Sequence, residues 1–218
     1  MTTSASGTLR SADLKSDLVK FVRSQVNRLQ QRYLADHSDA VAALAKLRRA
    51  VGKPAGSALD VYEYTFSEKL VRGWNRDEPS NAETAAHVAI TLYAVHQQSR
   101  SEGMHVEGRR LGAALGQLAR LSAPEAGGDQ LNAGVVRRFT AMGTAESFAE
   151  LCHHLRGLVQ LLRTQSIPLD YGLLARDLWL WQFPKHTSKV QFSWGRDFYL
   201  KDEKAQAPSL ASTEETDR

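Results

Sequence analysis

Cysteine is almost absent from this chain of 218 residues, and the single Cys152 excludes an internal disulfide. A lone thiol is typical of proteins kept in a reducing compartment. Long hydrophobic runs are also missing. No segment reaches the roughly 18 apolar residues of a membrane-spanning helix, and residues 1–10 lack the apolar core of a signal peptide. These absences predict a cytoplasmic protein without a membrane partner.

The motifs of the common enzyme classes are missing as well. The chain has no glycine-rich phosphate loop, no nucleophile elbow and no paired CxxC. Cys152, His153 and His154 look like metal ligands, but consecutive residues on a helix diverge by about 100° and cannot converge on one ion. We therefore predict a protein that is not an enzyme and that carries no cofactor and no metal ion.

A helical metalloenzyme is one alternative that the residues leave open. Glu150 with His153, and Glu102 with His105, match the Glu-x-x-His pair of di-iron helical bundles. The second pair falls in a glycine-containing connection, however, and no further glutamates clearly face a shared core. Elemental analysis of the purified protein would separate this class from a binding protein.

Negative charge is scarce over most of the chain and is concentrated at its end. The whole chain has a formal charge of +4, and residues 202–218 hold five acids against two bases, a net of −3. Residues 1–201 therefore carry +7, the difference between +4 and −3. A basic body favours an anionic partner such as nucleic acid. We predict that the polar residues 1–10 and the acidic tail 202–218 are unstructured.

Apolar residues recur at helical spacing, and no convincing strand pattern is present. The clearest stripe comprises Phe148, Leu151, Leu155, Leu158 and Leu162, which places one buried face on a helix. The whole pattern predicts an all-α protein of eight or nine helices. The small and polar run at 122–129 divides these into an N-terminal lobe, 11–123, and a C-terminal lobe, 130–201. Residues 59–71 are ambiguous, and we interpret them as a helix.

Capping residues predict where the helices begin and end. The first helix is expected to begin at Ser11. Ser80 with Glu83 three residues later forms a capping-box signature. Thr144 and Asp170 are placed to cap two later helices, and Pro184 is expected to end the second of these.

Two further helices have distinctive compositions. Leu111, Leu115 and Leu118 define a helix that is rich in glycine and alanine, so we expect it to pack closely against a neighbour. A last, aromatic helix is predicted to run from Val190 to Leu200.

Basic residues cluster at the edges of the apolar stripes. The candidate nucleic-acid-binding residues are Lys46, Arg48, Arg49, Arg137, Arg138, Arg156, Arg163, Lys185 and Lys189. On a helix, Arg156 and Arg163 share one flank and lie about 10 Å apart along the axis. Arginine forks match phosphate oxygens, so these clusters point to binding and not to catalysis.

The sequence resembles the CasB family, the small subunit of the type I-E CRISPR surveillance complex Cascade. The resemblance covers about residues 40–200 and is carried by an ordered set of short matches, at 47–49 (LRR), 94–96 (AVH), 111–118 (LGAALGQL), 137–139 (RRF), 154–156 (HLR), 161–163 (LLR), 167–171 (IPLDY), 194 (W) and 196–199 (RDFY).

This resemblance implies a non-catalytic, all-helical subunit present in two copies. The implied partners are CRISPR RNA, the large subunit CasA, the repeated backbone subunit CasC, and both the target and the displaced DNA strand of an R-loop. The matching basic positions here are Arg48, Arg49, Arg137, Arg138, Arg156 and Arg163. The alternative is a free-standing helical nucleic-acid-binding protein or regulator, which would be expected to carry a recognition helix with base-reading residues.

Overall fold

The computed structural model describes residues 3–71, 77–123 and 130–200, and this part of the chain folds into nine α-helices with no strand. The all-α class is therefore confirmed. The helices are α1 (Thr3–Leu34), α2 (Ser38–Arg49), α3 (Tyr62–Thr65), α4 (Asn81–Gln97), α5 (Leu111–Leu121), α6 (Ala133–Gly143), α7 (Phe148–Thr164), α8 (Tyr171–Trp181) and α9 (Pro184–Tyr199). The tail predicted to be unstructured, 202–218, lies outside the described residues.

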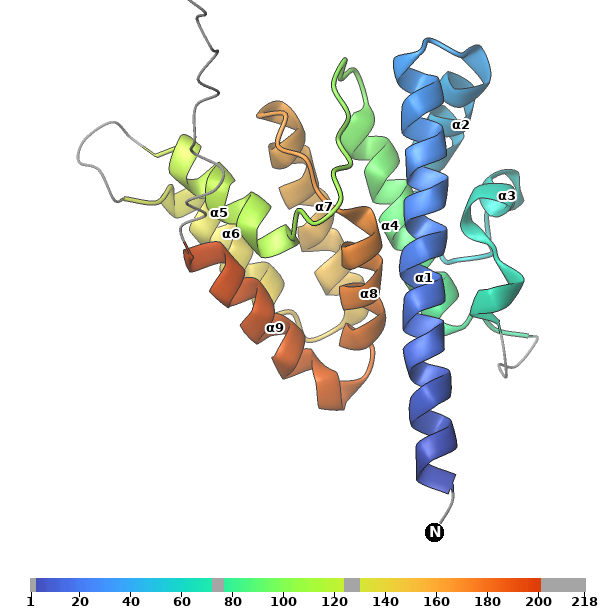
Figure 1. The fold of residues 1–218 in the computed structure, drawn as a ribbon. Helices are drawn as coiled ribbons and strands as arrows, with labels where there is room; N and C mark the ends of the chain where they lie inside the picture. The colour runs from blue at the N-terminus through green and yellow to red at the C-terminus, as the bar shows by residue number, and fades with distance from the viewer. Residues whose placement is uncertain (1–2, 72–76, 124–129, 201–218) are drawn as a thin grey trace, which may run out of the picture.

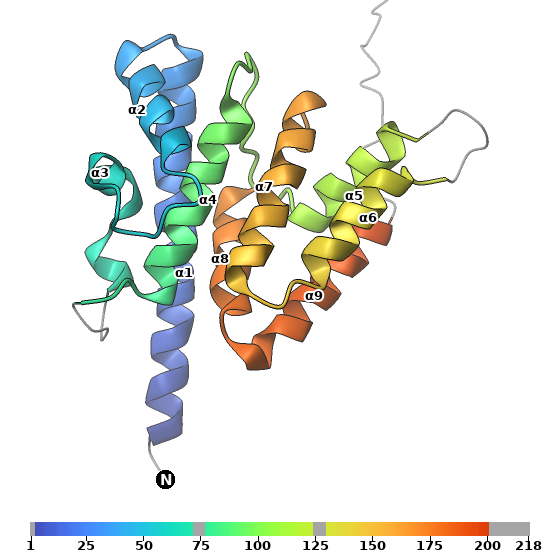
Figure 2. The same cartoon turned by 180° about the vertical axis from the view of Figure 1, so that it is seen from behind.

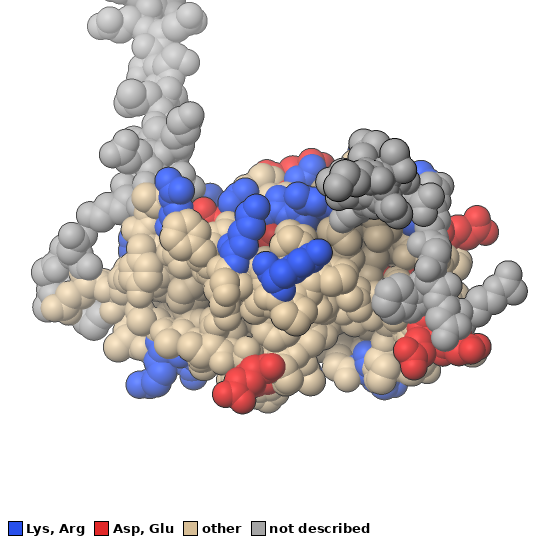
Figure 3. Space-filling model, turned by 90° about the horizontal axis from the view of Figure 1, so that it is seen from below, with Lys and Arg blue, Asp and Glu red and all other residues tan. Residues whose placement is uncertain are grey.

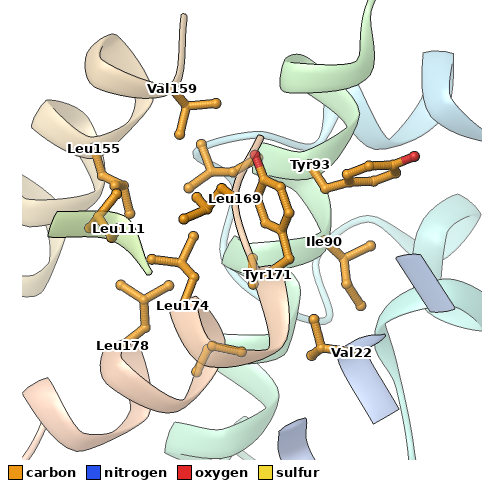
Figure 4. Packing of buried hydrophobic residues seen from close by; sticks show 14 of the residues in the cluster. Val22, Ile90, Tyr93, Leu111, Leu155, Val159, Leu169, Tyr171, Leu174 and Leu178 are labelled. Carbon is orange, nitrogen blue, oxygen red and sulfur yellow. The ribbon is translucent and has the colours of Figure 1, made fainter. Parts of the chain in front are cut away.

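The helices surround one hydrophobic core, and α4 lies at its centre. The long α1 runs along one side of the molecule with α2 and α3 beside it, while α5, α6 and α9 form the other side (Figures 1 and 2). Helices α8 and α7 lie between the two sides. Buried residues from α1, α2 and α4 to α9 belong to one cluster. Figure 4 shows part of this core, where Tyr171 and Leu174 of α8 lie between Ile90 of α4 and Leu155 of α7.

The packing crosses the boundary that the sequence suggested between two lobes. Helix α5, which precedes the boundary, packs against α9, and α8 packs against both α1 and α4. Most of the boundary segment, residues 124–129, lies outside the described residues. The division into lobes 11–123 and 130–201 stays a prediction.

Two of the predicted helix starts are confirmed. Ser80 precedes α4, where its hydroxyl accepts a hydrogen bond from the Glu83 amide and the Glu83 carboxylate accepts one from the Ser80 amide. Asp170 precedes α8 and accepts from the Leu173 amide at 3.0 Å. The amides in the first turn of a helix have no partner within the helix. The short, oxygen-bearing side chains of Ser80 and Asp170 reach these amides and accept their hydrogen bonds.

The predicted cap at Thr144 is wrong. The Thr144 hydroxyl donates to the Thr140 carbonyl at 3.0 Å and ends α6, and the cap of α7 is Ser147, which accepts from the Glu150 amide at 3.2 Å. Ser147 and Glu150 have the spacing of a capping box, which was a sufficient signal in the sequence. Thr144 is too far from the first turn of α7 to serve it.

Pro184 begins a helix and does not end one. Helix α8 ends at Trp181, and Pro184 lies in the first turn of α9, six residues before the predicted start at Val190. Proline suits a first turn because its missing N–H would have no partner there and its φ angle is already helical. The correction places Lys185 and Lys189 on the same helix as the C-terminal aromatic residues.

The other two differences concern helix length. Helix α1 begins at Thr3, so most of residues 1–10 is helical and not unstructured as predicted. A helix that already exists gains a hydrogen bond for each added residue without a new nucleation cost, and this segment contains no proline.

Residues 59–71 form short turns and not one helix: the 3₁₀ turn Leu59–Val61, α3, and the 3₁₀ turn Glu68–Leu70. Their dense β-branched and aromatic residues have modest helix propensity.

A buried carboxylate joins three distant segments. Asp170, fully buried at the start of α8, accepts from the guanidinium of Arg23 on α1 at 2.5 and 3.3 Å and from the amide of Gly108 at 2.8 Å. Burial alone would raise the pKa of Asp170, but the hydrogen bonds from Arg23, Gly108 and Leu173 outweigh burial and lower it. Asp170 is therefore charged at neutral pH and anchors α8 to α1 and to the connection before α5.

Tyr171 extends this anchor to α4. Its hydroxyl forms a 2.8 Å hydrogen bond with Nδ1 of His96, and its amide donates to Nδ1 of His105 at 3.2 Å. His96 is completely buried. Burial, followed by the nearby charges of Arg163 and Arg100, lowers the pKa of His96 to about 4. The imidazole is therefore neutral at physiological pH where it contacts Tyr171 of α8.

Glycines allow α5 and α9 to approach closely. A Cβ atom on Gly112 would collide with the carbonyl oxygen of Trp194, and one on Gly116 would collide with the carbonyl oxygen of Phe198. The predicted close packing of the Gly- and Ala-rich helix is thus confirmed. The side chain of the same Trp194 reaches α8, where its indole donates to Asp177 at 2.9 Å. Helix α9 is thus held against both α5 and α8.

These contacts predict opposite effects for the same substitution at two glycines. Gly112→Ala should lower the free energy of unfolding by about 1–3 kcal/mol, because the added methyl group forces α9 away from α5. Gly157→Ala is the matched control, since a Cβ there meets nothing within 4 Å in the middle of α7. It should raise stability by about 0.5–1 kcal/mol through helix propensity. Urea unfolding measures both, and equal effects would contradict the proposed crowding.

The buried imidazole predicts that stability falls in mild acid. Unfolded His96 binds a proton near pH 6.5 and folded His96 only near pH 4, so stability present above about pH 6.5 is lost as the pH falls toward 4. The slope from this group is at most about 1.4 kcal/mol per pH unit. His96→Gln should flatten the dependence in urea unfolding at several pH values. Tyr171→Phe is the control: it removes the hydrogen bond but keeps the titrating ring, so a slope as flat as that of His96→Gln would contradict this explanation.

Candidate nucleic-acid interface

The end of α2 and the end of α7 bring three predicted arginines together. Arg48 and Arg49 lie in the last turn of α2, and Arg163 lies in the last turn of α7. The Arg163 guanidinium donates to the Gln98 side chain at 2.9 Å, which ties it to the end of α4. Partial burial, with the charges of Arg49 and Arg163 close by, lowers the pKa of Arg48. Three like charges are thus held near one another by rigid helices.

The structure adds Arg100, which the sequence analysis did not select. Its guanidinium donates to the Ser166 hydroxyl at 3.3 Å, next to the end of α7. The charges of Arg100 and Arg163 both lower the pKa of His96, so both arginines lie near His96 at the end of α4. Little in the sequence pointed to Arg100, because it follows a helix as an isolated basic residue. We call Arg48, Arg49, Arg100 and Arg163 the arginine cluster.

The arginine cluster has no acidic partner. Across residues 3–71, 77–123 and 130–200, none of its four guanidinium groups pairs with a carboxylate, whereas Arg23, Arg32, Arg110 and Arg176 each do. Uncompensated guanidinium groups at one site repel one another. The arrangement is stabilised when an anion binds between them, and the arginine fork favours phosphate or carboxylate oxygens.

Four other predicted residues lie on α2, α6 and α7. Lys46 is half-buried on α2, Arg156 is exposed two turns before Arg163, and Arg137 and Arg138 are exposed on α6. Arg138 donates to the Gly134 carbonyl of its own helix at 3.4 Å. That these residues bind nucleic acid stays a prediction.

Lys185 and Lys189 lie on a further surface, the exposed face of α9. They share it with Phe192, Arg196 and Tyr199, which the sequence analysis missed. The spacing of four, three, four and three residues was visible in the sequence. It was overlooked because α9 was expected to begin only at Val190, which separated the lysines from the helix. We call these five residues the α9 stripe.

Charge is unevenly distributed over the molecular surface. In the view from below, Lys and Arg gather along one side of the face, while much of the rest is occupied by uncharged residues with a few carboxylates (Figure 3). An anionic ligand would thus meet a surface with distinct basic regions.

No helix in the described part of the chain is long and apolar enough to cross a membrane.

The cysteine and histidine candidates form no metal centre in the described residues, where no three His, Cys, Asp or Glu side chains lie close enough to hold an ion. Glu150 lies 3.6 Å from His154, one residue beyond the His153 of the suspected motif. Burial raises the pKa of the Cys152 thiol to about 12, so the reactive thiolate is scarce at neutral pH.

Comparison with known families gives a clear relationship. A family model described as CRISPR-associated protein Cse2 matches residues 43–199, which is more than half of the chain. The chain belongs to the Cse2 family. The match begins shortly before the basic end of α2 and ends at the last residue of α9, so it contains the arginine cluster and the α9 stripe.

Solved structures support the same family and fold. CasB from Thermobifida fusca is 35% identical with a TM-score of 0.69, covering 84% of this chain and 98% of that one. A Cse2-family protein from Thermus thermophilus is 28% identical with a TM-score of 0.59, covering 83% and 96%. A chain of a CRISPR RNA-guided surveillance complex is 20% identical with a TM-score of 0.62, covering 83% and 92%, and this likeness shows the fold alone. A search of curated proteins finds no match. The family resemblance inferred from the sequence is confirmed.

Proposed function

We propose that this Cse2-family chain is a non-catalytic subunit of a cytoplasmic CRISPR RNA-guided surveillance complex, where it steadies the R-loop by binding target and displaced DNA strands. The observation that carries the nucleic-acid part is the arginine cluster, in which four guanidinium groups without acidic partners are held at the ends of α2, α4 and α7. Membership of a complex is supported by the family and by the fold of the surveillance-complex chain.

The chemistry of the cluster suits binding without sequence reading. Phosphate contacts position a protein on a nucleic acid but carry no base information. In an RNA-guided complex the guide reads the sequence by base pairing, so a strand-holding subunit needs only phosphate contacts. Arg163 is braced by Gln98 and Arg100 by Ser166, and each guanidinium retains further donors for an anion. Pre-positioned donors of this kind lower the ordering cost of binding.

In this proposal, the basic residues outside the arginine cluster contact a second strand or a neighbouring subunit. Arg137 and Arg138 are exposed on α6, Arg156 on α7, and Lys185 and Lys189 on α9. One chain can therefore contact two strands, or one strand and another subunit. The subunits proposed as partners are the large subunit CasA, the backbone subunit CasC and a second copy of this chain, together with CRISPR RNA.

Co-purification tests membership of the complex. The tagged chain, isolated from its native host after nuclease-free lysis, should bring along a short RNA of uniform length and other protein subunits in fixed ratio. Recovery of the chain as a self-sufficient species, without RNA or other subunits, would support the free-standing binder. Arg32→Ala should leave co-purification intact, because Arg32 is an exposed arginine already paired with Asp39 at 2.8 Å.

Salt dependence tests the phosphate contacts. The double variant Arg48→Gln, Arg163→Gln should reduce the slope of log affinity against log salt by about 0.7–0.9 for each phosphate that is no longer bound, since fewer counterions are released. Affinity for unrelated sequences should fall equally. Arg137→Ala, Arg138→Ala tests the α6 pair in the same way, and Arg32→Ala is the matched arginine control. Binding of DNA is measured from about 50 to 200 mM salt, with thermal melts to verify folding.

An unchanged slope in a folded double variant would exclude phosphate contact for that pair. If the Arg137 and Arg138 variant instead fails to assemble while its DNA affinity is normal, those two residues contact a neighbouring subunit. The two results are distinct because assembly and DNA binding are measured separately.

A further inference from the structure

The α9 stripe forms one straight line along the outside of the molecule. Lys185, Lys189, Phe192, Arg196 and Tyr199 follow the 3.6-residue helical period, which places them within an arc of about 80° over an axial length of about 21 Å. The opposite face of the same helix carries the buried Val190, Trp194 and Phe198. Because packing is complete on that inner face, the outer stripe has no role in the core.

The stripe carries positive charge without compensation. In the described part of the chain, Lys185, Lys189 and Arg196 form no ion pair. The only acidic residue of α9 is Asp197, and its carboxylate is already paired with Arg110 of the preceding connection at 3.2 Å. The stripe is thus a row of cations, and an anionic chain complements it.

Two aromatic rings alternate with these cations. Phe192 is 69% exposed and Tyr199 is 62% exposed. They are seven residues apart, so they point in nearly the same direction about 10 Å from each other. Tyr199 is braced by an edge-to-face contact with Phe198, with ring centroids 4.9 Å apart. More than half of the surface of each residue is therefore accessible to a ligand.

We propose that the α9 stripe is a binding site for an unpaired nucleic-acid strand, with bases stacked on Phe192 and Tyr199 and phosphates bound by Lys189, Arg196 and Lys185. Alternation of cations and aromatic rings is the usual way to bind single strands without sequence preference, because every base has a flat π-face. A duplex keeps its base faces stacked inside and cannot use the rings. The inference rests on the proposed function and adds which form of nucleic acid this surface takes.

The stripe and the arginine cluster are separate sites. Helix α9 lies against α5 and α8, on the other side of the molecule from α2 (Figures 1 and 2). The glycine contacts with α5 hold the α9 backbone in place, so the spacing of the two rings is set before any strand binds. The two surfaces can therefore be altered independently.

The test compares single-stranded and duplex binding. The full-length chain is titrated with a labelled oligothymidylate and with a hairpin duplex of the same number of nucleotides. Phe192→Ala should weaken oligothymidylate binding by about five- to a hundredfold, the range found when one stacking ring is removed, and should leave the duplex and the salt slope unchanged. Phe192→Trp should retain binding, whereas Phe192→Leu should not. Lys189→Ala should weaken binding and lower the salt slope by about 0.7.

Leu59→Ala is the matched control, since Leu59 is an 81% exposed apolar residue on the distant turn before α3. It should change neither affinity. Equal losses for the strand and the duplex, or full binding by Phe192→Leu, would refute stacking at this position. If Phe192→Ala binds both nucleic acids normally but no longer joins the co-purified complex, the stripe is a protein contact and the inference is wrong. If the unaltered chain, alone and in the complex, binds neither probe, the proposed function itself fails.

Discussion

The buried carboxylate of Asp170 is the interaction on which the arrangement of the other helices depends. It receives hydrogen bonds from Arg23 on α1, from Gly108 in the connection before α5, and from the first turn of its own helix α8. A charge this deeply buried is tolerated only when its lone pairs are satisfied. The three segments must therefore meet in one geometry for the carboxylate to be stable. Tyr171 and His96 add α4 to the same anchor.

The basic surfaces are positioned by this anchor although they do not touch it. The end of α4 carries Gln98, which braces Arg163, and the connection that follows carries Arg100. Both segments are fixed by the contacts of Gly108 and His96 with α8. The buried carboxylates of Asp170 and Asp177 accept hydrogen bonds from Arg23 and Trp194, respectively. These two carboxylates are thus used inside the core, and no carboxylate of the described residues pairs with the arginines at the ends of α2 and α7.

Much of the fold could be read from the sequence, because helix faces and caps are local signals. The stripe from Phe148 to Leu162 and the caps at Ser80 and Asp170 are all present as predicted. Errors arose where one local signal has two structural uses, since a proline such as Pro184 can either end or begin a helix. The arginine cluster depends on how three helix ends meet in space. No local pattern encodes that meeting, so Arg100 was missed.

The glycines of α5 affect which substitutions the outer face of α9 can accept. Because Gly112 and Gly116 let the backbone of α5 pack directly on the backbone of α9, the position of α9 does not rely on its outward side chains. Those side chains can be replaced one at a time with little effect on folding. The outer face of α9 is therefore a surface where affinity can be tuned by substitution, or where a probe can be attached, while the framework beneath it stays the same.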